Sequence, residues 1–225
     1  MRPKHIAIIP DGNRRWAKKN GKSLLFAYDK GITHIGDVIK WCRKYRVREL
    51  TMWGFSTENF LRDRKEISQL FELFNSKLSE GMQHEYKKYR VRVRFLGRID
   101  ELPKEVSEKM RQVERDTEKH SKYQLNLMLA YGGRREIIDA VNRALRMRLG
   151  KVDEKSFASL LYTDGVSEPD LVIRTSGEVR TSGFLPWQSA YSEYYFSKKL
   201  WPDFTERDFK SALDDYSRRR RKYGK

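Results

Sequence analysis

The chain has 225 residues, of which 38% are hydrophobic and 12% aromatic, a size that fits one large α/β domain and leaves little room for two. Lysine and arginine number 48 against 31 aspartates and glutamates, so the formal net charge of +17 favours anionic partners: nucleic acid, an anionic membrane surface or phosphorylated substrates. One cysteine, Cys42, excludes an intrachain disulfide and a cysteine-based zinc site, and no apolar run approaches the roughly 18 residues of a membrane span.

Strand and helix patterns alternate along the whole chain. Short apolar runs predict strands at 4–9, 49–55, 91–97, 124–129, 170–174 and 193–196. Helical patterns fill 13–19, 29–46, 64–88, 104–120, 133–149, 155–162 and 205–222. This alternation predicts a single α/β domain over residues 1–225, with a mostly parallel six-stranded sheet that helices cover on both faces.

The first strand leads into a basic helix through a short acidic turn. The apolar run 6–9 stops at a proline, Asp11 follows in the turn, and a helix is predicted from Asn13. A helix start offers free backbone N–H groups that suit a phosphate, and Arg14 and Arg15 add positive charge. An acidic residue in this setting makes sense if a divalent cation lies between it and the phosphate. The alternative is an ordinary turn followed by a solvated basic face.

Polar segments follow four of the predicted strands. They are Asp11, Ser56–Asn59, Tyr131–Arg134 and Thr175–Gly177. Because ligands bind beyond the carboxyl ends of parallel strands, we expect these segments to meet at one edge of the sheet.

The predicted helix 64–88 carries an apolar stripe. The stripe consists of Ile67, Leu70, Phe71, Phe74, Leu78 and Met82. Core packing against the sheet is the ordinary interpretation of such a stripe, and the wall of an elongated apolar cavity is the functional one; one helix can do both.

A second polar cluster follows the fifth strand. That strand ends at Arg174, and two Ser-Gly turns follow, with Arg180 and Ser182 among them. A loop built from arginine, hydroxyl groups and flexible backbone suits another phosphate. Glu193 then supplies a carboxylate in an aromatic setting.

These segments together resemble the cis-prenyltransferases, the family that includes undecaprenyl diphosphate synthase. The matching stretches, in order, are 5–16, 51–59, 126–134, 170–178 and 187–203. A competing isoprenoid family would show an Asp-Asp-x-x-Asp box, which is absent here because Asp214-Asp215 is followed by Tyr216, Ser217 and Arg218. Several ordered motifs with consistent spacing make the resemblance specific over nearly the whole chain.

The resemblance implies a fold and a reaction. The fold is a parallel sheet ringed by helices, with an apolar tunnel, in a homodimer. The reaction joins an allylic prenyl diphosphate to isopentenyl diphosphate with Mg²⁺, releases diphosphate and forms a cis double bond. Preplaced N–H groups, arginines and Mg²⁺ would stabilise the departing diphosphate, and apolar walls would hold the growing chain.

The resemblance also implies roles for individual residues. Asp11 would be the magnesium ligand and central catalytic residue, and Glu193 would help to organise the metal or the acceptor site. The residues implied at the allylic diphosphate are Gly12, Asn13 and Arg15, with Arg14 as an added cation, and those at the acceptor diphosphate are Arg174, Arg180 and Ser182. The alternative for Glu193 is a buried ion pair with Arg174.

Further matches surround the reacting carbons and the prenyl tail. Ser56 and Asn59 would lie near the reacting carbons, with proton removal as a role considered for them. Arg62 and Glu66 match a mobile stretch, or simply form a surface pair four residues apart. The aromatic residues implied beside the tail are Trp16, Phe55 and Phe60, with plain core packing as the alternative for Trp16 and Phe55.

Four positions depart from the family pattern. Leu24 stands where an arginine is common, Tyr28 and Val179 stand where histidines are common, and Arg14 replaces a glycine. Ordinary drift is one explanation. The other is a variant enzyme that stops at short products, uses a different acceptor or condenses in a non-head-to-tail sense.

Rival functions and the cellular setting follow from the same residues. A non-catalytic partner subunit would lack the acidic residue after the first strand, whereas Asp11 is present. Nucleic-acid binding is not expected, because the basic residues are spread along the chain and no base-stacking module is visible. The basic tail 218–225 suits a solvated helix end, a reach into a partner's active site or attraction to anionic lipid. We expect a cytoplasmic protein that can contact a membrane peripherally.

Overall fold

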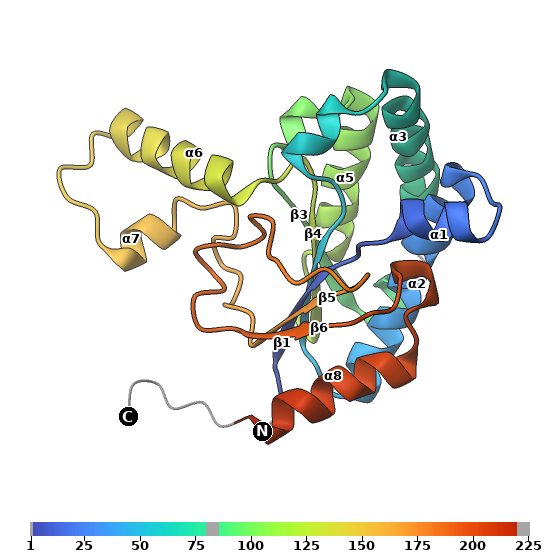
Figure 1. The fold of residues 1–225 in the computed structure, drawn as a ribbon. Helices are drawn as coiled ribbons and strands as arrows, with labels where there is room; N and C mark the ends of the chain where they lie inside the picture. Colours follow the sequence, from blue (N-terminus) through green and yellow to red (C-terminus); the bar gives the residue numbers. More distant parts are fainter. Residues whose placement is uncertain (1, 80–85, 220–225) are drawn as a thin grey trace.

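The computed structural model describes residues 2–79 and 86–219, and a parallel sheet forms their centre (Figure 1). Its strands are β1 (His5–Ile9), β2 (Glu49–Trp53), β3 (Val91–Leu96), β4 (Tyr123–Met128), β5 (Leu171–Arg174) and β6 (Glu193–Phe196). The strand order is β3-β4-β2-β1-β5-β6, and each neighbouring pair is parallel. All six predicted strands are confirmed, with boundaries that shift by at most two residues.

Helices occupy the first four connections between the strands, residues 175–192 between β5 and β6 contain none, and the last helix follows β6. They are α1 (Asn13–Lys19), α2 (Leu24–Lys44), α3 (Arg64–Ser79), α5 (Lys104–Thr117), α6 (Gly133–Arg146), α7 (Glu154–Ala158) and α8 (Glu206–Arg218). Three 3-10 helices were not expected: η1 (Thr57–Leu61), η2 (Ile99–Glu101) and η3 (Trp201–Asp203). Helix α2 begins earlier than predicted because the Ser23 side chain caps it, accepting the N–H of Phe26 at 3.1 Å. Met82 of the predicted stripe and residues 220–222 of the last predicted helix lie outside the described residues.

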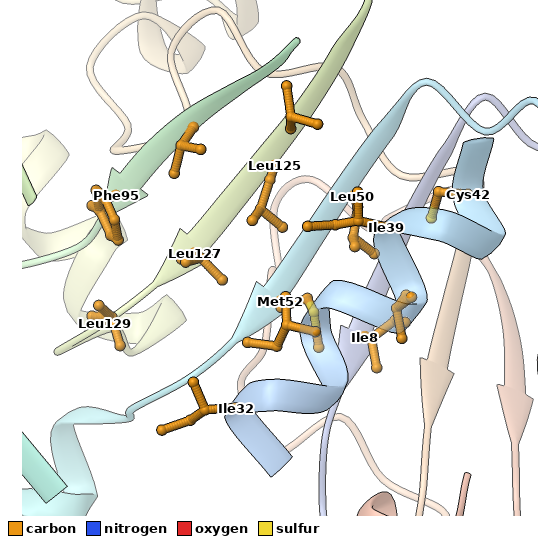
Figure 2. Packing of buried hydrophobic residues seen from close by; sticks show 14 of the residues in the cluster. Ile8, Ile32, Ile39, Cys42, Leu50, Met52, Phe95, Leu125, Leu127 and Leu129 are labelled. Atoms are coloured by element: carbon orange, nitrogen blue, oxygen red, sulfur yellow. The ribbon is translucent and has the colours of Figure 1, made fainter. Parts of the chain in front are cut away.

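The main core lies on one face of the sheet, beneath α2, α3, α5 and α8. Figure 2 shows Ile8 of β1, Met52 of β2 and Leu125 of β4, three strands that are neighbours in the sheet, on the face that Ile39 of α2 covers. The alternate β1 residue Ile9 packs on the other face, in a smaller cluster that holds Phe184 and Leu185 from the segment between β5 and β6. Because every residue of β1 is buried, this strand is apolar on both faces, as is typical of a central parallel strand.

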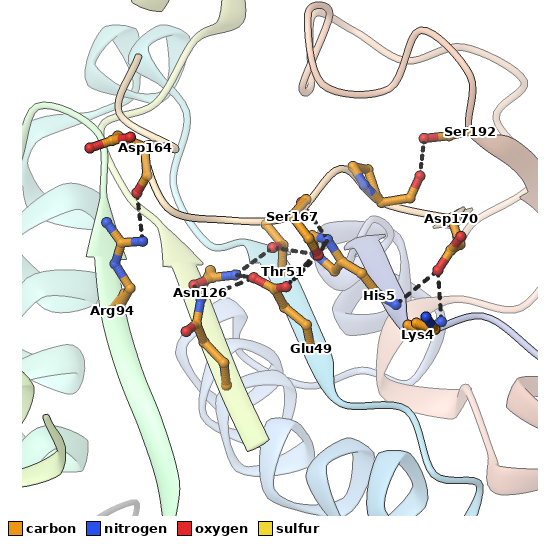
Figure 3. A network of polar contacts seen from close by, with 12 residues as sticks. Lys4, His5, Glu49, Thr51, Arg94, Asn126, Asp164, Ser167, Asp170 and Ser192 are labelled. Carbon is orange, nitrogen blue, oxygen red and sulfur yellow. Dashed lines mark hydrogen bonds and ion pairs between the residues drawn. The ribbon is translucent and has the colours of Figure 1, made fainter. Parts of the chain in front are cut away.

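At the end of the sheet where the parallel strands begin, here called the amino edge, polar side chains form hydrogen bonds with one another (Figure 3). Buried His5 contacts the Thr51 hydroxyl through Nε2 at 2.8 Å and the Ser167 carbonyl through Nδ1 at 2.7 Å. Asn126 donates to Thr51 at 3.0 Å and to Glu49 at 2.9 Å. This network joins β1, β2 and β4 to the segment before β5, at the end of the strands opposite the polar turns.

None of the described helices has both the length and the apolar composition needed to cross a membrane.

Candidate active site

The polar segments that follow the strands meet, as predicted, at the end of the sheet where the parallel strands terminate, here called the carboxyl edge. The Thr175 hydroxyl donates to the backbone carbonyl of Asp11 at 2.7 Å, which ties the turn after β5 to the turn after β1. Ser56 and Tyr131 form a parallel bridge beyond β2 and β4. Residues that follow β1, β2 and β5 line one cavity at this edge, whereas residues 132–134 after β4 line a neighbouring pocket.

A cavity of about 490 Å³ extends from this edge into the space between the sheet and helices α2, α3 and α5. At the edge its wall is polar and includes Asp11, Asn13, Ser56, Asn59, Arg174 and Ser182. Deeper in, apolar side chains such as Ile35, Met52, Leu78, Phe95 and Leu127 line it. The α3 stripe serves both purposes considered for it, since Leu70 and Phe74 line the cavity while Phe71 packs in the core.

The turn after β1 brings unpaired hydrogen-bonding groups to the cavity. Gly12 has a φ of 113°, and a Cβ there would lie 2.9 Å from Leu200 Cδ2 and 3.1 Å from the Ser176 Cβ, so the close packing requires glycine. The backbone N–H groups at the start of α1 lack intrahelical acceptors, the first such bond being from Trp16 N–H to the Gly12 carbonyl at 2.9 Å. The side-chain oxygen of Asn13 is buried and has no partner in the described part of the chain.

Arg174 lies at the centre of the polar wall. Its side chain is 6% exposed and donates from Nη2 to Asp11 Oδ2 at 2.8 Å. From Nη1 it donates to the Ser182 hydroxyl at 2.8 Å and to the backbone carbonyl of Arg180 at 2.7 Å, whereas its Nε is buried without a partner among the described residues. One guanidinium thus joins the turn after β1 to the loop after β5.

The loop after β5 presents further charged and hydroxyl groups. Arg15 donates to the Ser176 hydroxyl at 2.6 Å and pairs with Glu178 at 3.1 Å. Arg180 is 59% exposed and also pairs with Glu178. Ser176 and Ser182 have positive φ angles of 81° and 53°, a strained conformation for residues other than glycine that is common at functional sites. Ser176 lies in the segment 175–177 that was expected at this edge, whereas the contact of Arg15 with Glu178 was not predicted.

Ser56 and Asn59 form the start of η1 and line the cavity. The Asn59 side-chain oxygen accepts the Ser56 N–H at 3.1 Å, in a capping box that fixes both residues. Phe55 also lines the cavity, and Phe60 packs edge-on against it at 4.9 Å between ring centroids without reaching the cavity wall.

Trp16 does not line the cavity, and its predicted place beside a prenyl tail stays a prediction. The indole is 7% exposed and donates to Asp203 at 2.6 Å. It stacks on Phe26, with ring centroids 6.2 Å apart. The core-packing alternative therefore describes Trp16, because α1 turns this side of the helix toward α2 and η3.

Within one chain, Glu193 does not lie beside Asp11, and its predicted metal role stays a prediction. Glu193 is the first residue of β6, and in the strand register it pairs with Leu171 of β5, which in turn pairs with Ile6 of β1. Asp11 lies five residues after Ile6, toward the other end of the strands. At about 3.3 Å per residue, that offset is roughly 16 Å along the sheet. Its carboxylate accepts from Arg219 Nη1 at 2.7 Å, so the alternative pair with Arg174 is also absent. Over the described ranges, no group of three or more His, Cys, Asp or Glu could hold a metal ion.

Two of the departures from the family pattern lie outside the cavity wall. Val179 is 74% exposed, and Leu24 begins α2 beside a small hollow that Tyr28 and Glu66 also line. Neither side chain can supply the charge or hydrogen bond expected from the more common residue.

Comparison with known proteins gives a consistent result. A family model described as "Putative undecaprenyl diphosphate synthase" matches residues 9–224. An isoprenyl transferase of Thermotoga maritima is 46% identical over 226 residues, covering 99% of this chain and 97% of that protein. A tritrans,polycis-undecaprenyl-diphosphate synthase (geranylgeranyl-diphosphate specific) of Thermococcus kodakarensis is 44% identical over 230 residues, covering 99% and 87%.

A solved structure matches over the whole chain. It is the crystal structure of lavandulyl diphosphate synthase from Lavandula x intermedia in complex with dimethylallyl diphosphate. The TM-score is 0.94 at 30% sequence identity, and the match covers 100% of this chain and 99% of that one.

Proposed function

The chain belongs to the undecaprenyl diphosphate synthase family and is a prenyltransferase of the cis-prenyl diphosphate synthase type, and we propose that it condenses an allylic prenyl diphosphate with isopentenyl diphosphate in a Mg²⁺-dependent reaction. The observation that carries the proposal is the Asp11–Arg174 pair at 2.8 Å. It lies where a polar wall, rich in unpaired donors, meets a long apolar cavity. Residues 1–225 would act as one catalytic domain.

The turn after β1 suits the allylic diphosphate. The free N–H groups of residues 12–15, together with the Arg15 guanidinium, point positive partial charge toward the polar end of the cavity. When the allylic C–O bond breaks, negative charge grows on the departing diphosphate, and donors already in place stabilise it without reorganisation. The prenyl tail would then occupy the apolar part of the cavity, where Phe74 and Leu127 exclude water.

The loop after β5 suits the diphosphate of the acceptor. Arg174 and Ser182 line the cavity and are held together by a hydrogen bond, and Arg180 lies in the same loop with an exposed guanidinium. The unpartnered Nε of Arg174 is a buried donor that an anionic ligand would satisfy. Ser56 and Asn59 would orient the reacting carbons between the two diphosphates, because both lie in the cavity wall beyond β2.

The residues at the carboxyl edge fit a magnesium ion that is shared with substrate. Mg²⁺ is commonly held by one or two carboxylates plus phosphate oxygens, and Asp11 offers one carboxylate whose Oδ1 has no partner within the described residues. Bound there, the ion would neutralise charge on the departing diphosphate. Asp11 would be its protein ligand in this chain, since Glu193 lies at the opposite edge.

Features of the surface support a homodimer and a peripheral membrane contact. Helix α6 leaves Ile138, Val141 and Leu145 exposed by 53%, 41% and 70%, a stripe that a second copy would cover. Leu61 is 89% exposed and Phe26 50% exposed, and lysines 18, 19, 22 and 30 on α1, the following loop and α2 would attract anionic lipid. The lone buried thiol of Cys42 suits a reducing, cytoplasmic location.

The test is a product assay with purified protein and Mg²⁺. Dimethylallyl, geranyl or farnesyl diphosphate is supplied with and without isopentenyl diphosphate, and products are identified by mass and double-bond geometry. Cis-elongated products that disappear in Asp11→Ala would support the proposal, and elongation that persists in that variant would contradict it. Addition of a chelator should stop the same reaction if Mg²⁺ is required.

A different acceptor is the second candidate. The structural match names a lavandulyl diphosphate synthase bound to dimethylallyl diphosphate, and the present chain lacks the common residues at Leu24, Tyr28 and Val179. Products formed from dimethylallyl diphosphate alone would favour this candidate. Their absence, alongside normal elongation with isopentenyl diphosphate, would exclude it.

A further inference from the structure

Four side chains from three parts of the chain form one polar cluster at the donor side of the cavity, here called the Tyr28 cluster: Arg14, Tyr28, Arg62 and Glu66. The Tyr28 hydroxyl donates to Glu66 Oε1 at 2.9 Å and accepts from Arg62 Nη1 at 3.0 Å. Arg14 Nη2 lies 2.6 Å from both Glu66 oxygens, and Arg62 Nη1 lies 3.4 Å from Oε1. The cluster therefore links α1 and α2 to the start of α3.

The cationic members of the cluster reach the cavity. Arg14, Tyr28 and Arg62 line the cavity, whereas Glu66 does not and lines a small neighbouring hollow with a side chain 16% exposed. Two guanidiniums and one carboxylate leave one unbalanced positive charge. The Nε and Nη2 groups of Arg62 have no partner in the described ranges, so they remain available to an anion.

We propose that Tyr28 is a positioning residue for the allylic donor: its hydroxyl holds the Arg62 guanidinium at the mouth of the cavity, where Arg62 contacts the donor diphosphate. This inference rests on the proposed function and names how two residues that depart from the family pattern, Tyr28 and Arg14, contribute to it. Glu66 fixes the hydroxyl from behind and is itself held by Arg14. Without the hydroxyl, Arg62 keeps only its 3.4 Å contact with Glu66 and loses its fixed direction.

The chain offers a matched control on the same helix. Tyr45 at the end of α2 donates its hydroxyl to Glu206 at 2.8 Å, and Lys44 pairs with the same carboxylate. This group resembles one part of the Tyr28 cluster, because a phenol and a cation share one carboxylate, and it does not line the cavity. Tyr28→Phe and Tyr45→Phe each remove one hydrogen bond to a carboxylate, and only Tyr28→Phe also removes the bond from Arg62 at the cavity.

The experiment measures both variants with the full-length chain, Mg²⁺ and geranyl diphosphate as donor. In Tyr28→Phe we expect the donor KM to rise about 5- to 20-fold, which corresponds to about 1–1.8 kcal/mol and overlaps the net contributions of neutral and of charged hydrogen bonds. We expect kcat and the KM for isopentenyl diphosphate to change less than twofold, and Tyr45→Phe to change no kinetic constant by more than twofold. An unchanged donor KM in Tyr28→Phe, or an equal rise in Tyr45→Phe, overturns the inference.

The role through Arg62 is tested by combining variants. If Tyr28 acts by positioning Arg62, then Tyr28→Phe should raise the donor KM in the wild-type background and leave it unchanged in an Arg62→Ala background. Equal effects in both backgrounds would overturn the positioning role. Donor binding measured by calorimetry with a non-reacting thiolo analogue of geranyl diphosphate gives the same comparison without turnover. Wild-type protein that neither binds the analogue nor forms product would contradict the proposed function, whereas normal wild-type behaviour with no Tyr28 effect would contradict this inference alone.

A Tyr28→His variant adds a pH readout. Burial raises the pKa of Tyr28 above its ordinary value, so the native hydroxyl keeps its proton throughout the neutral range. An imidazole there would titrate among Arg14, Arg62 and Glu66, with Asp63 and Lys65 beside them. The donor diphosphate titrates in this range in both proteins, so we expect the donor KM of Tyr28→His to depend more steeply on pH between 5.5 and 7.5 than that of the wild type. Equal profiles for the two proteins would count against the role of this position in donor binding.

Discussion

The two edges of the sheet carry similar polar residues arranged in opposite ways. At the amino edge, His5, Thr51 and Asn126 satisfy one another at 2.8–3.0 Å and are buried (Figure 3). At the carboxyl edge, Asn13 Oδ1 and Arg174 Nε are buried without partners among the described residues. Because an unsatisfied buried polar group costs stability, the first edge holds the strands together and the second is prepared for a ligand.

The comparison is tested most strongly at Asp11. Asp11→Asn keeps the shape of the side chain and removes its charge, so the Arg174 pair and the proposed magnesium ligand are both weakened. We expect kcat/KM to fall about 10³-fold, the scale for losing a main electrostatic element of a site, with little change in thermal midpoint. A fall of less than tenfold would contradict the central role of Asp11.

The amino edge should respond in stability and not in rate. Asn126→Ala removes donors to Glu49 at 2.9 Å and to Thr51 at 3.0 Å from a fully buried position. We expect the free energy of unfolding to fall by about 2–4 kcal/mol, because the remaining partners lose their bonds and a cavity forms. Denaturant titration measures this loss. Donor and acceptor KM values should stay within twofold. A larger change in either KM would contradict the inference that the amino edge serves stability alone.

Two serines allow the same test with a smaller change. The Ser182 hydroxyl accepts from Arg174 at 2.8 Å at the carboxyl edge, and the Ser192 hydroxyl donates to the Pro169 carbonyl near the amino edge. We expect Ser182→Ala to raise the KM for isopentenyl diphosphate about 3- to 10-fold, the scale of the net contribution of one ordinary hydrogen bond. Ser192→Ala should leave that KM unchanged. Steady-state kinetics at saturating donor measure both values. A larger rise of this KM in Ser192→Ala than in Ser182→Ala would contradict the comparison of the two edges.

The smallest expected effect is a pH dependence of stability at the amino edge. Burial lowers the pKa of His5, although the nearby Glu49 carboxylate opposes this shift. The unfolded chain then binds more protons than the folded chain below an unfolded pKa of about 6.5, so the free energy of unfolding falls as pH drops through that value. We expect a loss of about 1 kcal/mol between pH 7.5 and 5.5. His5→Gln should reduce this slope, and an identical slope in the variant would assign the pH effect to other groups.

Much of the fold and part of the candidate site were predictable because they depend on local patterns. The strand 6–9 is apolar on both faces, and the break at Pro10 and the turn at Asp11 mark its end. Parallel strands then bring Asp11 and Arg174 to one edge whatever the details of the helices. Ser23, which caps α2, was a signal in the sequence for the early start of this helix. Helical periodicity alone did not reveal that start.

The positions of Glu193 and Trp16 in the fold could not be predicted from the motifs, for a physical reason. A motif assigns residue types to a function, but it does not say at which end of a strand each residue falls. Glu193 is the first residue of β6, and the register with Leu171 sets it at the amino edge. Trp16 is one helical turn past Gly12, and the direction in which α1 packs against α2 turned the indole into the core.

Sequence alone determined the order of strands and helices along this chain, the polar turns after the strands and the family to which the chain belongs. These features follow from short-range periodicity and from motifs of contiguous residues. Only the tertiary structure decided which distant side chains meet: Arg14 with Glu66, Tyr28 with Arg62, and Arg174 with Asp11. Such contacts depend on strand register and on the angles at which helices pack, and both are set by the whole core at once.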